Sequence, residues 1–458
     1  MKTLIQLLAG YMHGLTYEEI PDETLETAKM VILDAYGNLQ NSKNSESSKM
    51  VIRYAKQLSK DRIESEKIFF LDDSHEAVIQ DMAVFAYSVM GRMADMDDGF
   101  TKAMGHPGSF LVPILLVLSK KKHTDGKEML TALTAAYDVY ARIGEAINPF
   151  MHRDRGFDAT GVCGAIAAAG LIARLWETDL DTMENSMGLA ASFSGGLIEC
   201  QNDGTSGKYL CGAWAAANGL QAVRLAMNGF RGSARILEGK SGLFHGFCGH
   251  RGYDASAVAD RLGTSFKINE IYFKRYACLR GIHATMDAVS ELMREYELEE
   301  KNIVSVDIRA SEFLLRLSRP APETPVSAQG SLQFGAAVIM KYGHLKTEEF
   351  LEKCMNDPEI HRVMKKITVT EDETQKEYLN HHPTHFSASK VVVFTEDGRC
   401  LDKFKGLPDG EEGEHRFGWK ELEEKFRWLS AKLPTQMQDM YIAQIRKLDQ
   451  EECCLNFV

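Results

Sequence analysis

The sequence predicts a mainly α-helical protein, with a large all-helical domain over residues 1–269 and a smaller α+β domain over residues 270–410. Its 458 residues exceed what one hydrophobic core usually supports, so two domains are expected. Apolar residues recur at helical spacing up to about residue 265, whereas alternation with period two appears only after residue 270. Helical periodicity returns over residues 419–448, and we therefore expect residues 411–458 to complete the first domain.

In the large domain, the first well-marked helix is predicted after Pro21, where apolar residues from Leu25 to Ala35 recur at i, i+3, i+7 and i+10. Residues 110–118 are strongly apolar, but they are too few to span a membrane and contain Pro113, which favours a buried helix. Small side chains let helix backbones approach closely, so stretches rich in them predict a tightly packed centre. These stretches are residues 160–170, 189–196 and 212–219.

In the smaller domain, short alternating segments predict strands, and helical patterns lie between them. The expected strands are residues 303–308, 367–369 and 390–394, and the turn signal Asp397-Gly398 follows the last. The expected helices are residues 331–340 and 347–355.

Composition excludes several classes of function. The formal net charge is −12, and the sequence has no block of Lys and Arg residues that would neutralise nucleic-acid phosphates. We therefore expect no nucleic-acid partner. Nine cysteines without C-x-x-C or zinc-type spacing favour reduced thiols and a cytoplasmic protein. The N-terminal apolar stretch is too short and polar for a signal peptide, and no membrane partner is expected.

An acidic cluster is the first candidate for chemistry. Asp95, Asp97 and Asp98 are followed by His106, and the group lies between the apolar segments 82–93 and 110–118. Carboxylates held between buried helices have perturbed pKa values, and a histidine exchanges protons near neutral pH. The pattern therefore favours a site of proton transfer.

This region and three later ones resemble the MmgE/PrpD family, whose members carry D-F-D-D-[TS] followed by H-P-[GS]. The matching segments are Asp95-Met96-Asp97-Asp98 with His106-Pro107-Gly108, residues 155–161 (family G-[WF]-H-x-T-G), residues 237–242 (L-E-G-x-x-G) and residues 273–276 ([FI]-K-x-[YF]). His283 in the following helix also matches. Four motifs in the same order over nearly 200 residues are far more specific than any one alone.

The resemblance implies a helical domain, an α+β lid domain and a homodimer that needs neither a metal nor an organic cofactor. The family includes methylcitrate dehydratase, cis-aconitate decarboxylase and iminodisuccinate epimerase, so the resemblance implies a small carboxylate substrate. Lys208 and Lys274 match positions that line the family's pocket. Removing a proton next to a carboxylate builds negative charge, which such cations would stabilise while a base takes the proton.

The resemblance assigns further roles around the pocket. Asp95 matches the leading aspartate of the family's segment, so Asp95 or His106 is expected to be the base, and Asp97 to hold the loop or bind substrate. Arg275 and Tyr276 are expected to bind substrate, as is Asp158.

Two departures from the family pattern alter the expected pocket. Gly99 stands where the family has Thr or Ser, and Asp158 stands where it has His. A hydroxyl and an imidazole are therefore missing, and an anionic Asp158 would repel a substrate carboxylate.

Other features are weaker candidates. His381, His382 and His385 lack a carboxylate frame and are expected at the surface, so no metal site is predicted. Cys163 and Cys278 are expected to pack as small hydrophobes. The stretch from Gly204 to Lys208 lacks the spacing of a phosphate-binding loop.

The leading prediction is a lyase of the methylcitrate dehydratase type, with catalytic residues Asp95, His106, Lys208 and Lys274. The alternatives, in order, are an epimerase of a dicarboxylate, a cis-aconitate decarboxylase, and a non-catalytic family member that binds a metabolite.

Overall fold

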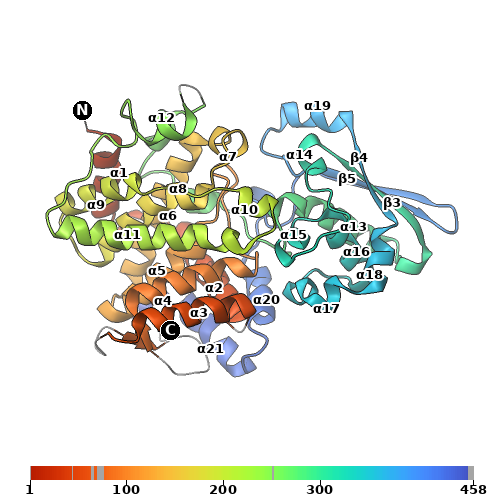
Figure 1. Ribbon diagram of the computed structural model, residues 1–458, viewed down its shortest axis with the longest axis horizontal. Helices are drawn as coiled ribbons and strands as arrows, with labels where there is room; N and C mark the ends of the chain where they lie inside the picture. The colour runs from red at the N-terminus through yellow and green to blue at the C-terminus, as the bar shows by residue number, and fades with distance from the viewer. Residues whose placement is uncertain (1, 44, 63–66, 70–76, 250–251, 452–458) are drawn as a thin grey trace.

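The structure is a computed structural model that describes residues 2–43, 45–62, 67–69, 77–249 and 252–451. Two bodies lie side by side (Figure 1): a large helical one and a smaller one built on a sheet. Each body has its own hydrophobic core. The protein is mainly α-helical, as the sequence predicts.

The large body is a bundle in which helices pack around two almost wholly buried ones, α5 and α8. Its helices are α1 (Leu4–Gly14), α2 (Asp22–Ser42), α3 (Glu46–Ser59), α4 (Gln80–Met93), α5 (Gly108–Lys122), α6 (Gly126–Ile147), α7 (Phe150–Arg153), α8 (Ala159–Leu175), α9 (Leu180–Ser192), α10 (Glu199–Asn202), α11 (Leu210–Met227) and α12 (Leu243–Cys248). A hairpin of β1 (Lys67–Phe69) and β2 (Ala77–Ile79), which the sequence analysis did not predict, also belongs to this part of the chain.

Small residues allow the central helices to approach closely, as predicted. A Cβ added at Gly219 of α11 would lie 2.8 Å from the Cβ of Ala168 in α8. A Cβ added at Gly164 of α8 would lie 3.0 Å from the Cβ of Ala215 in α11. Larger side chains at these crossings would push the two helices apart.

The C-terminal helices α20 (Trp419–Leu429) and α21 (Thr435–Arg446) return to the large body and pack on α2. A Cβ added at Gly37 of α2 would lie 3.0 Å from Leu429 and 3.2 Å from Phe426. The amphipathic pattern of the last helices is thus buried against the N-terminal part of the chain.

The smaller body holds a four-stranded sheet in the order β4-β3-β5-β6. Its strands are β3 (Ile303–Ala310), β4 (Ile367–Glu371), β5 (Ser389–Thr395) and β6 (Cys400–Lys405), and β3 pairs parallel with β4 and antiparallel with β5. Its helices are α13 (His283–Glu295), α14 (Glu312–Leu315), α15 (Pro325–Gln329), α16 (Leu332–Tyr342), α17 (Glu352–Met355), α18 (Pro358–Met364) and α19 (Glu373–His381). The helix predicted over residues 347–355 is wrong as one piece, because Leu351 is extended and divides it.

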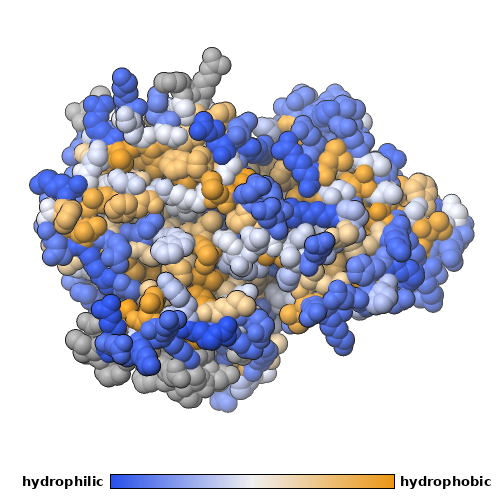
Figure 2. All heavy atoms as spheres, viewed as in Figure 1, coloured by the Kyte–Doolittle hydropathy of each residue, from blue (hydrophilic) through white to orange (hydrophobic). Residues whose placement is uncertain are grey.

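The face seen in Figure 2 is polar around its rim, with apolar patches over the large body. None of the described helices is both long and apolar enough to cross a membrane. The apolar helix at residues 110–118 is buried inside α5, as predicted.

Candidate active site

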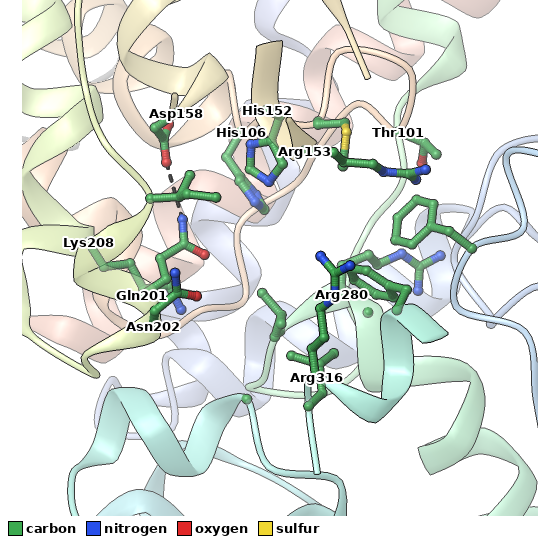
Figure 3. A pocket seen from close by; sticks show the side chains of 18 of the residues that line it. Thr101, His106, His152, Arg153, Asp158, Gln201, Asn202, Lys208, Arg280 and Arg316 are labelled. Atoms are coloured by element: carbon green, nitrogen blue, oxygen red, sulfur yellow. Dashed lines mark hydrogen bonds between the residues drawn. The ribbon is translucent and has the colours of Figure 1, made fainter. Parts of the chain in front are cut away.

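A cavity of about 490 Å³ opens between the two bodies. The side chains that carry charge around it are six cations (Arg92, Arg153, Lys208, Arg280, Arg316, Arg319) and three carboxylates (Asp154, Asp158, Glu312), together with His106 and His152. Figure 3 shows Lys208, Gln201 and Asp158 on one side and Arg280 and Arg316 on the other, with His106 and His152 directed into the space between. Such a cavity suits a ligand with several negative charges.

The loop between α4 and α5 builds one wall of this cavity. It begins at Asp95, whose φ of 49° turns the chain sharply after α4. Gly99 then pairs with Tyr272, and Asp98 Oδ1 accepts a hydrogen bond of 2.9 Å from Gly108 N at the start of α5. The loop is therefore fixed at both ends by buried groups.

A buried charge cluster lies under this loop. Asp95 accepts hydrogen bonds from Lys274 Nζ at 2.6 Å and Lys208 Nζ at 2.7 Å, one to each carboxylate oxygen. Arg92 Nη1 lies 2.9 Å from Asp97 Oδ2 and 3.4 Å from Asp95 Oδ1. Three cations and two carboxylates leave one net positive charge, and all five side chains are at most 5% exposed.

This cluster decides which acidic group can act as a base. Burial alone would raise the pKa of Asp95, but the charges of Lys208, Lys274 and Arg92 outweigh it and hold that pKa well below its usual range. The pKa of Asp97 is lowered in the same way by Arg92 and His106 against the effect of burial. A carboxylate so stabilised is a poor proton acceptor. The geometry thus favours His106 over Asp95 as the base.

His106 is held in one tautomer. Its Nδ1 lies 2.8 Å from the backbone oxygen of Asp98 and 3.2 Å from Asp97 Oδ2. Both are acceptors at neutral pH, so Nδ1 carries the proton and Nε2 keeps a lone pair. Burial, reinforced by the charge of Arg92, lowers the pKa of His106 and keeps the ring neutral. A neutral imidazole with a free Nε2 at a cavity wall is a suitable general base.

Lys208 brings a cation to the same wall. It lies in a short 3-10 helix, Ser206–Tyr209, directly before α11, and it lines the cavity while bonding to Asp95. Burial lowers the pKa of Lys208, although Asp95 opposes this effect. Asp95 therefore positions Lys208 rather than facing the cavity itself.

Asp158, the residue that departs from the family motif, has a local structural role. It is the N-cap of α8, where its Oδ1 accepts hydrogen bonds from the backbone N–H groups of Thr160 at 2.8 Å and Gly161 at 3.3 Å. Gln201 Nε2 donates to its other oxygen at 3.3 Å (Figure 3). These donors offset the negative charge that the sequence analysis expected to repel a substrate.

Three predicted substrate-binding residues do not line the cavity. Arg275 turns to Asp409, with its Nη1 2.5 Å from Asp409 Oδ2, and Tyr276 donates to Asp287 at 2.9 Å. Asp97 lies behind His106 and Arg92. Arg275 and Tyr276 bond to Asp409, in the loop before α20, and to Asp287, in α13, instead of facing the cavity. The motif alone does not show these partners.

Several cavity residues were missed by the sequence analysis. His152 on α7 lines the cavity, its Nδ1 is buried without a hydrogen-bond partner within the described chain, and burial lowers its pKa. Tyr272, Arg280, Arg316 and Arg319 were also missed. Tyr272 and Arg280 flank the matched motif at residues 273–276, which is the one signal that could have drawn attention to them.

The two cysteines and the histidines at positions 381, 382 and 385 do not line the cavity. Burial raises the thiol pKa of Cys163 and of Cys278, as expected of packed cysteines. His385 Nδ1 lies 2.7 Å from the hydroxyl of Tyr378. Nowhere among the residues that the structure describes do three or more His, Cys, Asp or Glu side chains gather as metal ligands.

Comparisons with known proteins match both parts of the chain. The MmgE/PrpD N-terminal domain matches residues 6–256, and the MmgE/PrpD C-terminal domain matches residues 276–450. Cis-aconitate decarboxylase of Mus musculus is 22% identical over an alignment of 472 residues. The alignment covers 99% of this chain and 92% of the relative. A cis-aconitate decarboxylase-like protein of Aspergillus oryzae is 27% identical over 356 residues, 72% of each chain. The 2-methylcitrate dehydratase of Cupriavidus necator is 25% identical over 395 residues, 79% of this chain and 77% of the relative.

Proposed function

Because this chain belongs to the MmgE/PrpD family, we propose that it is a lyase that removes a proton next to a carboxylate of a small polycarboxylate and expels a hydroxyl group. The observation that carries the proposal is that His106, in a fixed neutral tautomer, lines the same cavity as the buried cation Lys208. A base and a stabilising cation on one wall are what proton abstraction from a weak carbon acid requires.

The steps follow from this wall. Nε2 of His106 takes the proton, and the electron pair left on carbon moves into the adjacent carboxylate. Lys208 and Arg92, already paired and buried, stabilise the resulting dianion without having to reorganise. The imidazolium then gives its proton to the departing hydroxyl, so the net change is loss of one water and formation of a carbon–carbon double bond.

Decarboxylation is the second candidate, because relatives named cis-aconitate decarboxylase align with almost the whole chain. Loss of CO2 is favoured when the departing carboxylate is not held by cations. Six cations around the cavity would stabilise a bound carboxylate and so oppose its departure as CO2, which favours proton abstraction instead.

Proton NMR in D2O tests the proposal. The purified protein would be incubated with citrate, 2-methylcitrate, cis-aconitate, itaconate, iminodisuccinate and simpler hydroxy acids, beside a His106→Asn variant. A new olefinic signal that the variant does not produce is expected. Loss of CO2 would favour the decarboxylase, deuterium wash-in without loss of a group would favour an epimerase, and no change in any compound would overturn the proposed activity.

A further inference from the structure

Gly99 and Tyr272 fit together across the cavity wall. Their backbones exchange two hydrogen bonds, Gly99 N to Tyr272 O at 3.1 Å and Tyr272 N to Gly99 O at 2.8 Å. A Cβ added at Gly99 would lie 2.3 Å from both Cζ and the hydroxyl oxygen of Tyr272. Glycine is therefore the residue that leaves room for this ring, and the tyrosine hydroxyl occupies the space beside position 99.

The hydroxyl of Tyr272 is available to a ligand. The side chain lines the cavity and is only 4% exposed, yet no group in the described chain hydrogen-bonds to its hydroxyl. The oxygen is also not among the buried polar atoms cut off from solvent. Burial raises the pKa of Tyr272, so the group stays protonated and can donate a hydrogen bond.

Positive charge lies directly behind the ring. The guanidinium of Arg280 is 4.6 Å from the centroid of Tyr272, and its Nη2 bonds to Glu411 at 2.6 Å. Its Nε and Nη1 are buried without partners in the described residues. The ring of His106 meets that of Tyr272 edge-on, with centroids 6.3 Å apart. A donor on a ring that contacts both a cation and the base is well situated for a carboxylate.

We propose that the hydroxyl of Tyr272 binds one carboxylate of the substrate, and that Gly99 is required because it makes room for that hydroxyl. The inference rests on the proposed function and adds a substrate-binding residue to it. It also accounts for the first departure from the family motif: the hydroxyl absent at position 99 is supplied from the facing segment.

Calorimetric binding of unreactive ligands tests this. Propane-1,2,3-tricarboxylate would be compared with glutarate, which lacks the central carboxylate, and 2-methylsuccinate, which lacks a terminal one. We expect Tyr272→Phe to weaken tricarboxylate binding about tenfold, the usual effect of losing a hydrogen bond to a charged group. For the truncated ligand that lacks the contacted carboxylate, wild type and variant should bind equally.

Two further variants complete the design. Gly99→Ala should weaken tricarboxylate binding as well, because its Cβ displaces the ring. Tyr11→Phe removes a hydroxyl that bonds to Asp138 away from the cavity and should bind as wild type does. If Tyr272→Phe binds every ligand within about twofold of wild type, the inference is wrong while the proposed function stands. If wild type binds none of the ligands, the proposed function fails, and this inference with it.

Discussion

The two walls of the cavity use their positive charges differently. On the helical wall, formed by Arg92, His106 and Lys208, the cations are buried and already paired with carboxylates. On the small-domain wall, formed by Arg280, Arg316 and Arg319, Arg280 is likewise buried and paired, with Glu411, but Arg316 is 69% exposed and within the described chain pairs only with Glu312, one helical turn away. Charges fixed before the substrate arrives stabilise a transition state, whereas exposed ones mainly attract and select the ligand. The comparison predicts chemistry on the first wall and recognition on the second.

The largest effect is expected at His106. His106→Asn removes the base but keeps a polar side chain, and kcat should fall by about 10²–10⁴-fold. Steady-state kinetics on the compound that reacts would measure this. The exposed His13 offers a matched control, since His13→Asn changes no cavity group. If His106→Asn kept nearly full kcat, the base would not be His106 and would not lie on the helical wall.

Stability separates two neighbouring aspartates of the same loop. Asp95→Asn leaves Lys208, Lys274 and Arg92 with too little negative charge in a buried site, which should cost about 3–5 kcal/mol of unfolding free energy. Burial, only partly offset by the hydrogen bond from Tyr137, raises the pKa of Asp98 to about 8, so Asp98 is already protonated at pH 7. Asp98→Asn should cost only about 1 kcal/mol.

Urea denaturation at pH 7 measures the loss of unfolding free energy in Asp95→Asn and in Asp98→Asn, and repeating it at other pH values measures how each loss depends on pH. Between pH 3.8 and about 8, Asp98 is protonated in the folded state but ionised in the unfolded state. The free energy of unfolding of the wild type therefore falls as pH rises toward 8. The difference in unfolding free energy between wild type and Asp98→Asn should therefore become smaller as pH rises toward 8. Equal losses for the two variants would contradict the charge assignment of the cluster.

The pH dependence of kcat/KM sharpens the account of the helical wall. The base form of His106 exists above its pKa, which is lowered from 6.5, so the acidic limb should have its midpoint below pH 6.5. Lys208 must stay charged, and its pKa is lowered from 10.5, so activity should fall at alkaline pH with a midpoint below 10.5. An acidic midpoint above pH 6.5 would point to a different base.

The smallest effect is expected on the small-domain wall. Arg316→Gln should raise KM about two- to fivefold at low salt and leave kcat unchanged, since exposed charges contribute little and are screened. Arg362→Gln, outside the cavity, is the matched control. A fall in kcat for Arg316→Gln would place chemistry on this wall as well.

The sequence predicted regular elements better than the contacts between them. The periodicity after Pro21 and the alternation at residues 303–308 correspond to α2 and β3. One buried face fixes the pattern of β3, whereas α2 is buried on nearly every side. Strand β6 was missed, since its residues alternate between exposed and half-buried positions and carry no run of apolar residues.

The site was predictable only in part, for the same reason. Asp95 meets Lys208 and Lys274 across 113 and 179 residues, and no local pattern encodes such a contact, so only the motif resemblance pointed to it. Arg275 and Tyr276 share that motif but turn to other carboxylates. His152 and Arg316 stand alone in the sequence, and only the fold brings them to the cavity.

The most direct test follows the rate of olefin formation at saturating ligand, for wild type, His106→Asn and Arg316→Gln. We predict that His106→Asn loses olefin formation even at saturation, while Arg316→Gln recovers the full wild-type rate once enough ligand is present. Olefin formation that survives in His106→Asn, or that stays low in Arg316→Gln at saturation, would contradict the division between a chemical wall and a recognition wall.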